Sequence, residues 1–199
     1  FLLLFVLAFP LIWDMDGLLS IWLGADAKTP EMTVFSQLIL IYAMVISLEP
    51  PISRLIQATG KIKRYQLSVG AITLTYIPIA ALAFALGGSA TLSLVILIAI
   101  MGVAQIVRVY VASRQVNLDP GNYLKEVVIP VLKTSIIGGA VYQLSLLTSS
   151  STETIPVILL HILTAAICGV FIALILGLNR EDRKLIYDLI KDKFHKTHI

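Results

Sequence analysis

The sequence predicts an all-α protein, a polytopic transmembrane helix bundle with six membrane-spanning segments, the first truncated, and a C-terminal amphipathic surface helix. Composition is the first reason, because 58% of the 199 residues are hydrophobic and 14% are charged. Soluble domains are about 45–50% apolar and about 25% charged, and a soluble chain with this balance would expose large apolar patches. The second reason is the length of the apolar runs, and the third is the position of the basic residues.

Six apolar segments follow one another along the chain: 1–13, 34–58, 67–86, 91–112, 127–147 and 155–178. A helix needs about 20 apolar residues to cross the bilayer core, and the last five segments are long enough. Runs such as LSLVILIAIMGVA lack the alternation of a barrel strand. The first segment opens without Met or a basic region, unlike a signal peptide. We therefore expect it to be the tail of a longer span, in the C-terminal part of a longer protein.

The basic residues of the loops are concentrated on one side of the membrane. Residues 14–33, 87–90 and 148–154, which we expect to be outer loops, carry a single basic residue, Lys28. The alternate loops and the tail carry eleven: Lys61, Lys63, Arg64, Arg114, Lys125, Arg180, Arg183, Lys184, Lys191, Lys193 and Lys196. The positive-inside rule places these and the C-terminus in the cytoplasm. In the tail, Asn179 and Asp182 resemble a capping box, which predicts a helix on the anionic inner leaflet.

The most polar stretch within a span is Leu48–Gln66, LEPPISRLIQATGKIKRYQ. Pro50 and Pro51 are expected to break the helix, because each lacks a backbone N–H. Glu49 either carries a coupling ion such as a proton or pairs with Arg54 across the break. The planar guanidinium of Arg54 suits a phosphate, and Gln57, three residues on, lies on nearly the same helix face.

Other polar groups have both a structural and a functional interpretation. Arg108, near the inner end of the fourth segment, is expected either to extend toward the headgroups or to bind an anion with Lys61, Lys63 and Arg64. Single polar residues within the spans are expected to bond to neighbouring helices, and two acids of the first loop to be solvated: Gln37, Gln143, His161, Asp14 and Asp16. The one cysteine, Cys168, predicts no disulfide framework, and no motif predicts a metal, a cofactor or nucleic-acid binding.

The order of these features resembles a known family. A span ends in Pro10, an outer loop carries Trp22-Leu23-Gly24, and a span broken by proline is followed by QATGKIKRYQ (57–66). This resembles the C-terminal half of bacterial polysaccharide biosynthesis proteins, the Wzx-like O-antigen flippases of the multidrug/oligosaccharidyl-lipid/polysaccharide exporter superfamily. In that family a small residue, Gly and Lys commonly follow an even-numbered span, as Ala58, Gly60 and Lys61 do here. The resemblance covers most of the chain and is best over residues 1–113.

The resemblance implies a MATE-like fold of two six-helix lobes around a central cavity, followed by two extra helices. Residues 1–113 would be the last four helices of the C-terminal lobe, 127–178 the two additional transmembrane helices, and 179–199 a cytoplasmic tail. The cargo would be an undecaprenyl-pyrophosphate-linked oligosaccharide, flipped across the bacterial cytoplasmic membrane by alternating access. Its partners would be this lipid-linked oligosaccharide, membrane lipids and other polysaccharide assembly proteins. Substrate binding is then expected of Arg54, Gln57, Arg108, Lys61 and Arg64, and ion coupling of Glu49.

Three alternatives stay open. A cation-coupled multidrug antiporter of the same fold would favour acidic cavity residues, which Glu49 supports and the two arginines oppose. A membrane enzyme of polysaccharide assembly normally has a long outer loop or an interfacial cluster of acids and histidines, and the sequence has neither, so we expect no enzyme. A purely structural membrane subunit would have interior charges that it could lose without effect.

Overall fold

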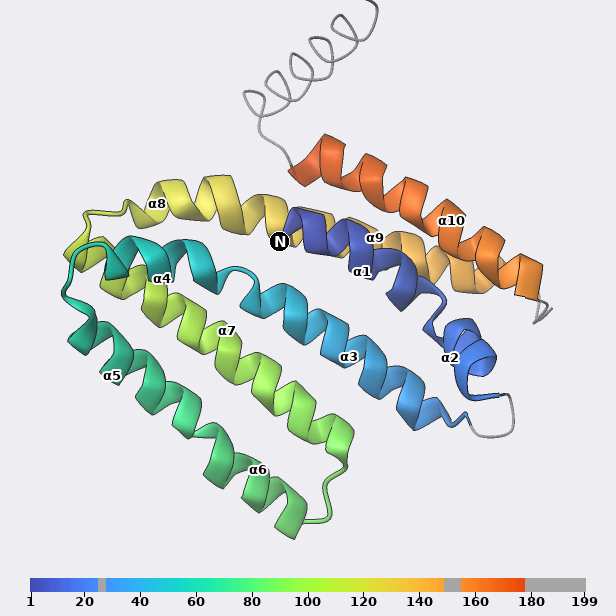
Figure 1. Ribbon diagram of the computed structural model, residues 1–199, viewed down its shortest axis with the longest axis horizontal. Coiled ribbons are helices and arrows are strands. Elements are labelled where there is room, and N and C mark those ends of the chain that lie inside the picture. Colours follow the sequence, from blue (N-terminus) through green and yellow to red (C-terminus); the bar gives the residue numbers. More distant parts are fainter. Residues whose placement is uncertain (25–27, 149–154, 178–199) are drawn as a thin grey trace, which may run out of the picture.

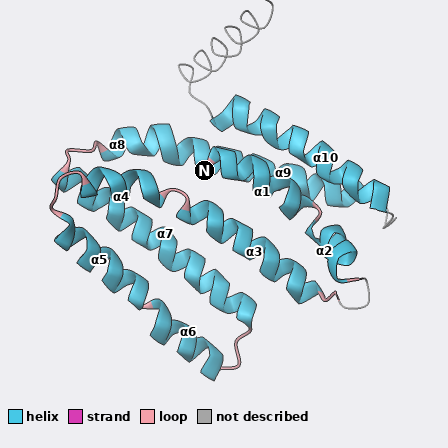
Figure 2. Cartoon of the chain, in the orientation of Figure 1, coloured by secondary structure: helices cyan, strands magenta, loops and turns pink. Residues whose placement is uncertain are grey.

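The structure, a computed structural model, describes residues 1–24, 28–148 and 155–177. In these ranges every regular element is helical, as Figure 2 shows. The elements are α1 (Leu2–Trp13), α2 (Met15–Leu23), α3 (Pro30–Ile46), α4 (Glu49–Gln57), α5 (Ile62–Leu74), α6 (Tyr76–Ala85), α7 (Ala90–Gln115), α8 (Pro120–Tyr123), the π-helical turn η1 (Leu124–Val128), α9 (Ile129–Thr148), α10 (Ile155–Ile172) and the π-helical turn η2 (Ala173–Gly177). The predicted tail helix and the side chain of Gln143 lie outside what is described.

Within the described ranges, four helical segments are long and apolar enough to cross a membrane: Pro30–Gln57, Ile62–Ala85, Ala90–Gln115 and Ile155–Ile175. A fifth span is reached if α1 and α2, which are bent by 70° at Asp14, count as one. The prediction of an all-helical chain is thus confirmed for the described residues, and their four or five membrane-length helices are consistent with a multi-pass membrane protein. The span predicted over 127–147 corresponds to α9, which is not among these four, so the count of six stays a prediction.

The first loop differs from the prediction. Residues 14–33 were expected to be an outer loop, but Met15–Leu23 form helix α2. The segment MDGLLSIWL contains no proline that would interrupt a helix. The Ser20 hydroxyl donates a hydrogen bond of 2.7 Å to the Gly17 carbonyl, within the helix itself, and so does not compete with helical backbone bonding. The helix ends at Gly24, whose φ of 87° and ψ of 148° lie in a region that glycine reaches without the steric cost of a Cβ.

The helix break lies where the prolines lead one to expect it. Helix α3 ends at Ile46 and α4 begins at Glu49, with Pro50 and Pro51 in the first turn of α4. A proline in the first turn is tolerated because its missing N–H has no helical partner to lose there. The carbonyls four residues earlier, of Ile46 and Ser47, therefore have no amide donor of their own helix.

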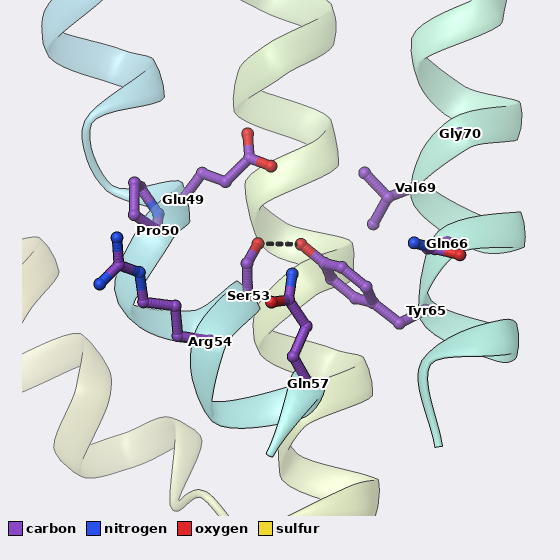
Figure 3. A pocket seen from close by; sticks show the side chains of 9 residues that line it. All are labelled: Glu49, Pro50, Ser53, Arg54, Gln57, Tyr65, Gln66, Val69 and Gly70. Atoms are coloured by element: carbon purple, nitrogen blue, oxygen red, sulfur yellow. Dashed lines mark hydrogen bonds between the residues drawn. The ribbon is translucent and has the colours of Figure 1, made fainter. Parts of the chain in front are cut away.

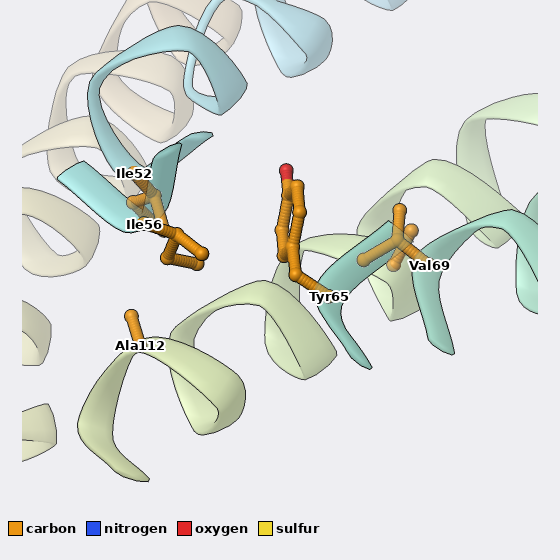
Figure 4. Close-up of a cluster of buried hydrophobic side chains, with 6 residues drawn as sticks. Ile52, Ile56, Tyr65, Val69 and Ala112 are labelled. Atoms are coloured by element: carbon orange, nitrogen blue, oxygen red, sulfur yellow. The ribbon is translucent and has the colours of Figure 1, made fainter. Parts of the chain in front are cut away.

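Helix α7 is the centre of the packing, between α3–α4 on one side and α5–α6 on the other (Figure 1). One apolar cluster joins α4, α5 and α7, and Figure 4 shows its side chains: Ile52, Ile56, Tyr65, Val69, Ala104 and Ala112. A second cluster joins α1, α3 and η2: Phe5, Ala8, Phe9, Met44 and Ala173. Many other large apolar side chains are exposed, which suits helices whose outer faces meet lipid.

Glycines allow α1 to lie close to both α9 and α10. A Cβ at Gly138 of α9 would be 2.9 Å from the Phe5 ring, and one at Gly169 of α10 would be 3.1 Å from the Phe9 ring. Small residues at such crossings let membrane helices approach closely. Helix α1 is thereby packed against both helices that were predicted to be additions to the lobe.

Candidate functional site

An ion pair between a buried arginine and a partly exposed glutamate joins α7 to the first residue of α4, next to the helix break. The Nη2 atom of Arg108 lies 2.8 Å from Oε2 of Glu49. Arg108 is only 4% exposed, whereas the Glu49 side chain is 39% exposed. The expectation that Arg108 extends toward the headgroups is therefore wrong, and so is the pairing of Glu49 with Arg54. The reason is the packing of α4 on α7, which brings a carboxylate to a guanidinium that cannot reach water.

Gln105 extends this pair into a network. Its Oε1 accepts a hydrogen bond from Arg108 Nη1 at 3.3 Å, and its Nε2 donates to the Leu48 carbonyl and to the Tyr123 hydroxyl, both at 3.1 Å. Leu48 lies in the break between α3 and α4, and Tyr123 ends α8. Burial raises the pKa of Tyr123, although the bond from Gln105 acts the other way, so the phenol keeps its proton at neutral pH. One side chain thus connects the break, α7 and α8.

Arg108 keeps one unused donor. Its Nε is buried, and among the residues that the structure describes it has no hydrogen-bond acceptor. A buried charged donor without a partner is costly, since the desolvation of the group is not compensated. Glu49 and Gln105 are therefore the two side chains that compensate this guanidinium among the described residues.

A polar cavity of about 430 Å³ lies between α4 and α5, and Figure 3 shows the side chains around it. Its lining consists of Glu49, Pro50, Ser53, Arg54, Gln57, Tyr65, Gln66, Val69 and Gly70. The hydroxyls of Ser53 and Tyr65 are hydrogen-bonded to each other across the wall, and both side chains are buried. The side chains of Arg54, Gln57 and Gln66 are exposed, and they have no hydrogen-bond or ion-pair partner within the described part of the chain.

A second, larger cavity of about 1080 Å³ lies on the other side of the network. Side chains of α1, α3, α7, α8, η1 and α9 line it, and most of them are apolar. Leu48, Gln105 and Tyr123 belong to its wall, whereas Glu49 belongs to the wall of the polar cavity. The network of Glu49, Arg108 and Gln105 therefore separates a polar cavity from an apolar one.

The structure brings together only part of the predicted set. Glu49, Pro50, Arg54 and Gln57 line the polar cavity, and Arg108 joins it through Glu49. Pro51, Lys61, Lys63 and Arg64 are exposed and line neither of the two cavities. Sequence reasoning missed five residues of the wall and two of the network: Ser53, Tyr65, Gln66, Val69 and Gly70, and Gln105 and Tyr123. The adjacent polar pair Tyr65-Gln66 at the start of an apolar segment was a signal for two of them.

Polar side chains also meet near the bend between α1 and α2. His161 Nδ1 of α10 lies 3.8 Å from Asp14 Oδ2, and Asp16 pairs with Lys28 and accepts a hydrogen bond from Thr33. The Asp14 side chain is 17% exposed, so the expectation of a solvated residue is wrong there. Gln37 donates to the Ile12 carbonyl, which confirms that it bonds to a neighbouring helix. In the three described ranges no cluster of His, Cys, Asp and Glu suits a metal ion.

These features describe an α-helical protein with several helices that could cross a membrane and with a charged network between two cavities. Comparison of the chain with protein-family models, with curated proteins and with solved structures gives no match.

Proposed function

We propose that this chain is the C-terminal part of a flippase that moves an undecaprenyl-pyrophosphate-linked oligosaccharide across the bacterial cytoplasmic membrane by alternating access. The observation that carries the proposal is the presence of a polar and a larger apolar cavity on the two sides of the network that contains the Glu49–Arg108 ion pair. A lipid-linked sugar has the same two parts, a hydroxyl-rich anionic headgroup and a long hydrocarbon chain. The polar cavity matches the headgroup in chemistry, and the apolar cavity matches the hydrocarbon chain.

The polar cavity suits the headgroup. Arg54 provides a planar donor for phosphate or carboxylate oxygens, and the amides of Gln57 and Gln66 offer donors and acceptors to hydroxyls. The apolar cavity suits a hydrocarbon chain, because the rings of Phe1, Phe5 and Phe9 form part of its wall. Transfer of such a chain from water to an apolar wall is favourable in proportion to the area covered.

The ion pair suits a two-state transporter. While Glu49 is ionised it holds Arg108 and, through Gln105, the break at Leu48. A proton on Glu49 removes the charge that compensates Arg108, which favours a different arrangement of α4 on α7. Glu49 is thus the residue we propose for ion coupling, and Arg108 its counter-charge.

The finer expectations belong to the same proposal. They are a MATE-like lobe, six spans that correspond to helices nine to fourteen of the family, a C-terminus in the cytoplasm, and a function in transport without catalysis. The outward-facing apolar side chains support the membrane setting, and the alternation of loop charge supports the orientation.

A complementation experiment tests the proposal. The full-length gene, as wild type or with Arg108→Gln or Glu49→Gln, is returned to a deletion strain, and surface polysaccharide, internal lipid-linked oligosaccharide and membrane protein level are measured. We expect both variants to insert, to lose surface polymer and to accumulate lipid-linked units inside. Arg114→Gln is the control, because it removes an exposed arginine of the same helix. Normal surface polymer in the deletion strain would refute the flippase.

A multidrug antiporter is the second candidate, and the apolar cavity favours it. A cavity of about 1080 Å³ is large enough for an amphipathic drug, and Glu49 supplies the acid that cation exchange needs. Its pairing with Arg108 argues against direct binding of a cationic drug. The deletion strain discriminates, because an antiporter would change drug resistance and leave polysaccharide intact.

A further inference from the structure

The polar contacts at the bend between α1 and α2 form a second titratable site, which the proposed function does not use. We infer that Asp14 and His161 are a proton-binding pair, and that a proton on His161 fastens α10 to this bend. The pair lies on the side of the bundle that the loop charges predict to be the outer one. The inference does not depend on the cargo, because it concerns only the pH at which this end of the bundle is held together.

Asp14 lies where the chain turns between two helices. Helix α1 ends at Trp13 and α2 begins at Met15, and the two are bent by 70° at this residue. The Asp14 side chain is 17% exposed, and its Oδ2 atom is buried without a hydrogen-bond partner among the described residues. A buried carboxylate oxygen without a donor is costly, because its lost hydration is not replaced. The bend thus contains an acceptor that a nearby donor would stabilise.

His161 of α10 is placed to supply that donor. Its Nδ1 atom lies 3.8 Å from Asp14 Oδ2, which is longer than a hydrogen bond but within the distance of an ion pair. The histidine side chain is 39% exposed, so a proton from solution has access to it. A neutral imidazole has a donor on one nitrogen only, whereas a protonated one has a donor on both and carries a positive charge. Proton uptake therefore converts a loose contact into a charge-assisted bond.

The pair is the polar end of an otherwise apolar interface between α10 and the α1–α2 segment. A Cβ at Gly17 of α2 would be 3.0 Å from Cγ1 of Ile158. A Cβ at Gly169 of α10 would be 3.1 Å from the Phe9 ring. Helix α10 thus meets α2 near its own beginning and α1 farther along, and Figure 1 shows α2 beside this beginning of α10. These apolar contacts carry no titratable group, so the response to a proton is confined to the polar pair.

Other charged groups near Asp14 leave His161 as the member that responds to pH. The described elements around the bend contribute one histidine, two acids and one lysine: His161, Asp16, Glu31 and Lys28. Asp16 is paired with Lys28 and accepts a hydrogen bond from Thr33 of α3, so these two charges act on Asp14 in opposite directions. Helix α1 has no ionisable side chain, and Glu31 is exposed in the first turn of α3. Histidine is the residue type whose charge ordinarily changes between pH 5 and 8.

The direction of the pH response follows from linkage. A proton on His161 is held more tightly when the pair is closed, so closure and proton uptake favour each other. The stabilisation is therefore present at low pH and is lost as the pH rises through the range in which histidine releases its proton. We expect α2 and α10 to be held together at pH 5.5 and to separate more often at pH 8.

The first test measures the proton on His161 directly. Full-length protein with ¹³C-labelled histidine is titrated in lipid nanodiscs by NMR, and His161→Gln identifies the signal. We expect Asp14→Asn to lower the affinity of His161 for a proton about three- to tenfold, because the opposite charge is lost. Glu31→Gln removes an exposed acid from the same end of the bundle and is expected to leave that affinity unchanged. An affinity in Asp14→Asn equal to that of the wild type overturns the pair.

The second test measures the distance between the two helices. Spin labels are attached at Trp22→Cys of α2 and Leu160→Cys of α10, both exposed positions, in full-length protein whose native cysteines, including Cys168, are replaced. With the native pair present, we expect a narrow distance distribution at pH 5.5 that broadens at pH 8. His161→Gln should give a broad distribution at both pH values. His161→Lys, which keeps a positive charge, should give a narrow one at both.

The outcomes decide the inference in either direction. A distribution that does not change with pH in the wild type, or a pH dependence that survives in His161→Gln, overturns it. If His161→Gln is too unstable to measure, His161→Lys decides, because broadening at pH 8 in this variant would show that the charge of residue 161 does not hold the helices. The expected pattern supports the pair whether or not the reconstituted protein moves lipid-linked oligosaccharide.

Discussion

The ion pair between Glu49 and Arg108 leads to an asymmetric prediction. Glu49→Gln leaves Arg108, which is 4% exposed, with a buried charge and an unused Nε. Removal of one partner of a buried pair costs about 3–5 kcal/mol, and partial exposure of this carboxylate lowers the expected loss to about 2–4 kcal/mol. Arg108→Met instead leaves Glu49, whose side chain is 39% exposed and can be hydrated. Its expected loss is about 1 kcal/mol.

The double variant completes the test. With Glu49→Gln and Arg108→Met together, no uncompensated charge stays buried, so we expect a stability close to that of Arg108→Met alone. The free energy of unfolding is measured by reversible denaturation of the full-length protein in mixed micelles. The difference from additivity should exceed about 1 kcal/mol, as for residues in direct contact. Equal losses in the two single variants, or additive losses in the double variant, would refute the pairing and its burial.

Three further predictions use matched changes. Gly138→Leu places a side chain against the phenyl rings of α1 and is expected to cost about 1–3 kcal/mol, whereas Gly139→Leu meets open space and is expected to cost less, as thermal unfolding would reveal. Gln105→Leu removes both hydrogen bonds that this amide donates, and amide exchange around the helix break should become faster while α6 is unchanged. Tyr65→Phe leaves the buried Ser53 hydroxyl without its partner and should lower the free energy of unfolding by about 1–3 kcal/mol. The additional change Ser53→Ala removes that hydroxyl and should largely restore the stability.

Local patterns predicted the class and much of the helical organisation. Long apolar runs predict membrane-length helices because the bilayer core sets one length, and the structure has four or five of them. Pro50 and Pro51 predict the break between α3 and α4, because each lacks the N–H that would bond to a carbonyl of the preceding turn. The glutamine at position 37 was expected to bond to a neighbouring helix, and it does. Each of these predictions depends only on residues close in sequence or on the solvent.

The contacts of the candidate site depend on packing that no local pattern contains. Glu49 and Arg108 are far apart in the chain, and they meet because α4 packs on α7. From the sequence, the nearer Arg54 was an equally good partner for Glu49, and the end of a span was a reasonable place for an arginine that reaches the headgroups. Helix α2 was missed for a different reason, since a short amphipathic segment with acids at its start is typical of both a loop and a helix.

The two prolines also have a mechanical consequence. A straight helix resists bending because a bend must break bonds between successive turns, but at the α3–α4 junction those bonds are already missing at the Ile46 and Ser47 carbonyls. The nine-residue helix α4 can therefore rotate as a rigid body about Ser47 and Leu48 with little loss of backbone hydrogen bonding. The resistance to that swivel comes instead from side chains, chiefly Gln105 on the Leu48 carbonyl and Arg108 on Glu49. The resistance of this hinge to rotation thus depends on side-chain interactions, and a proton on Glu49 or an anion that competes for Arg108 can break the ion pair among them.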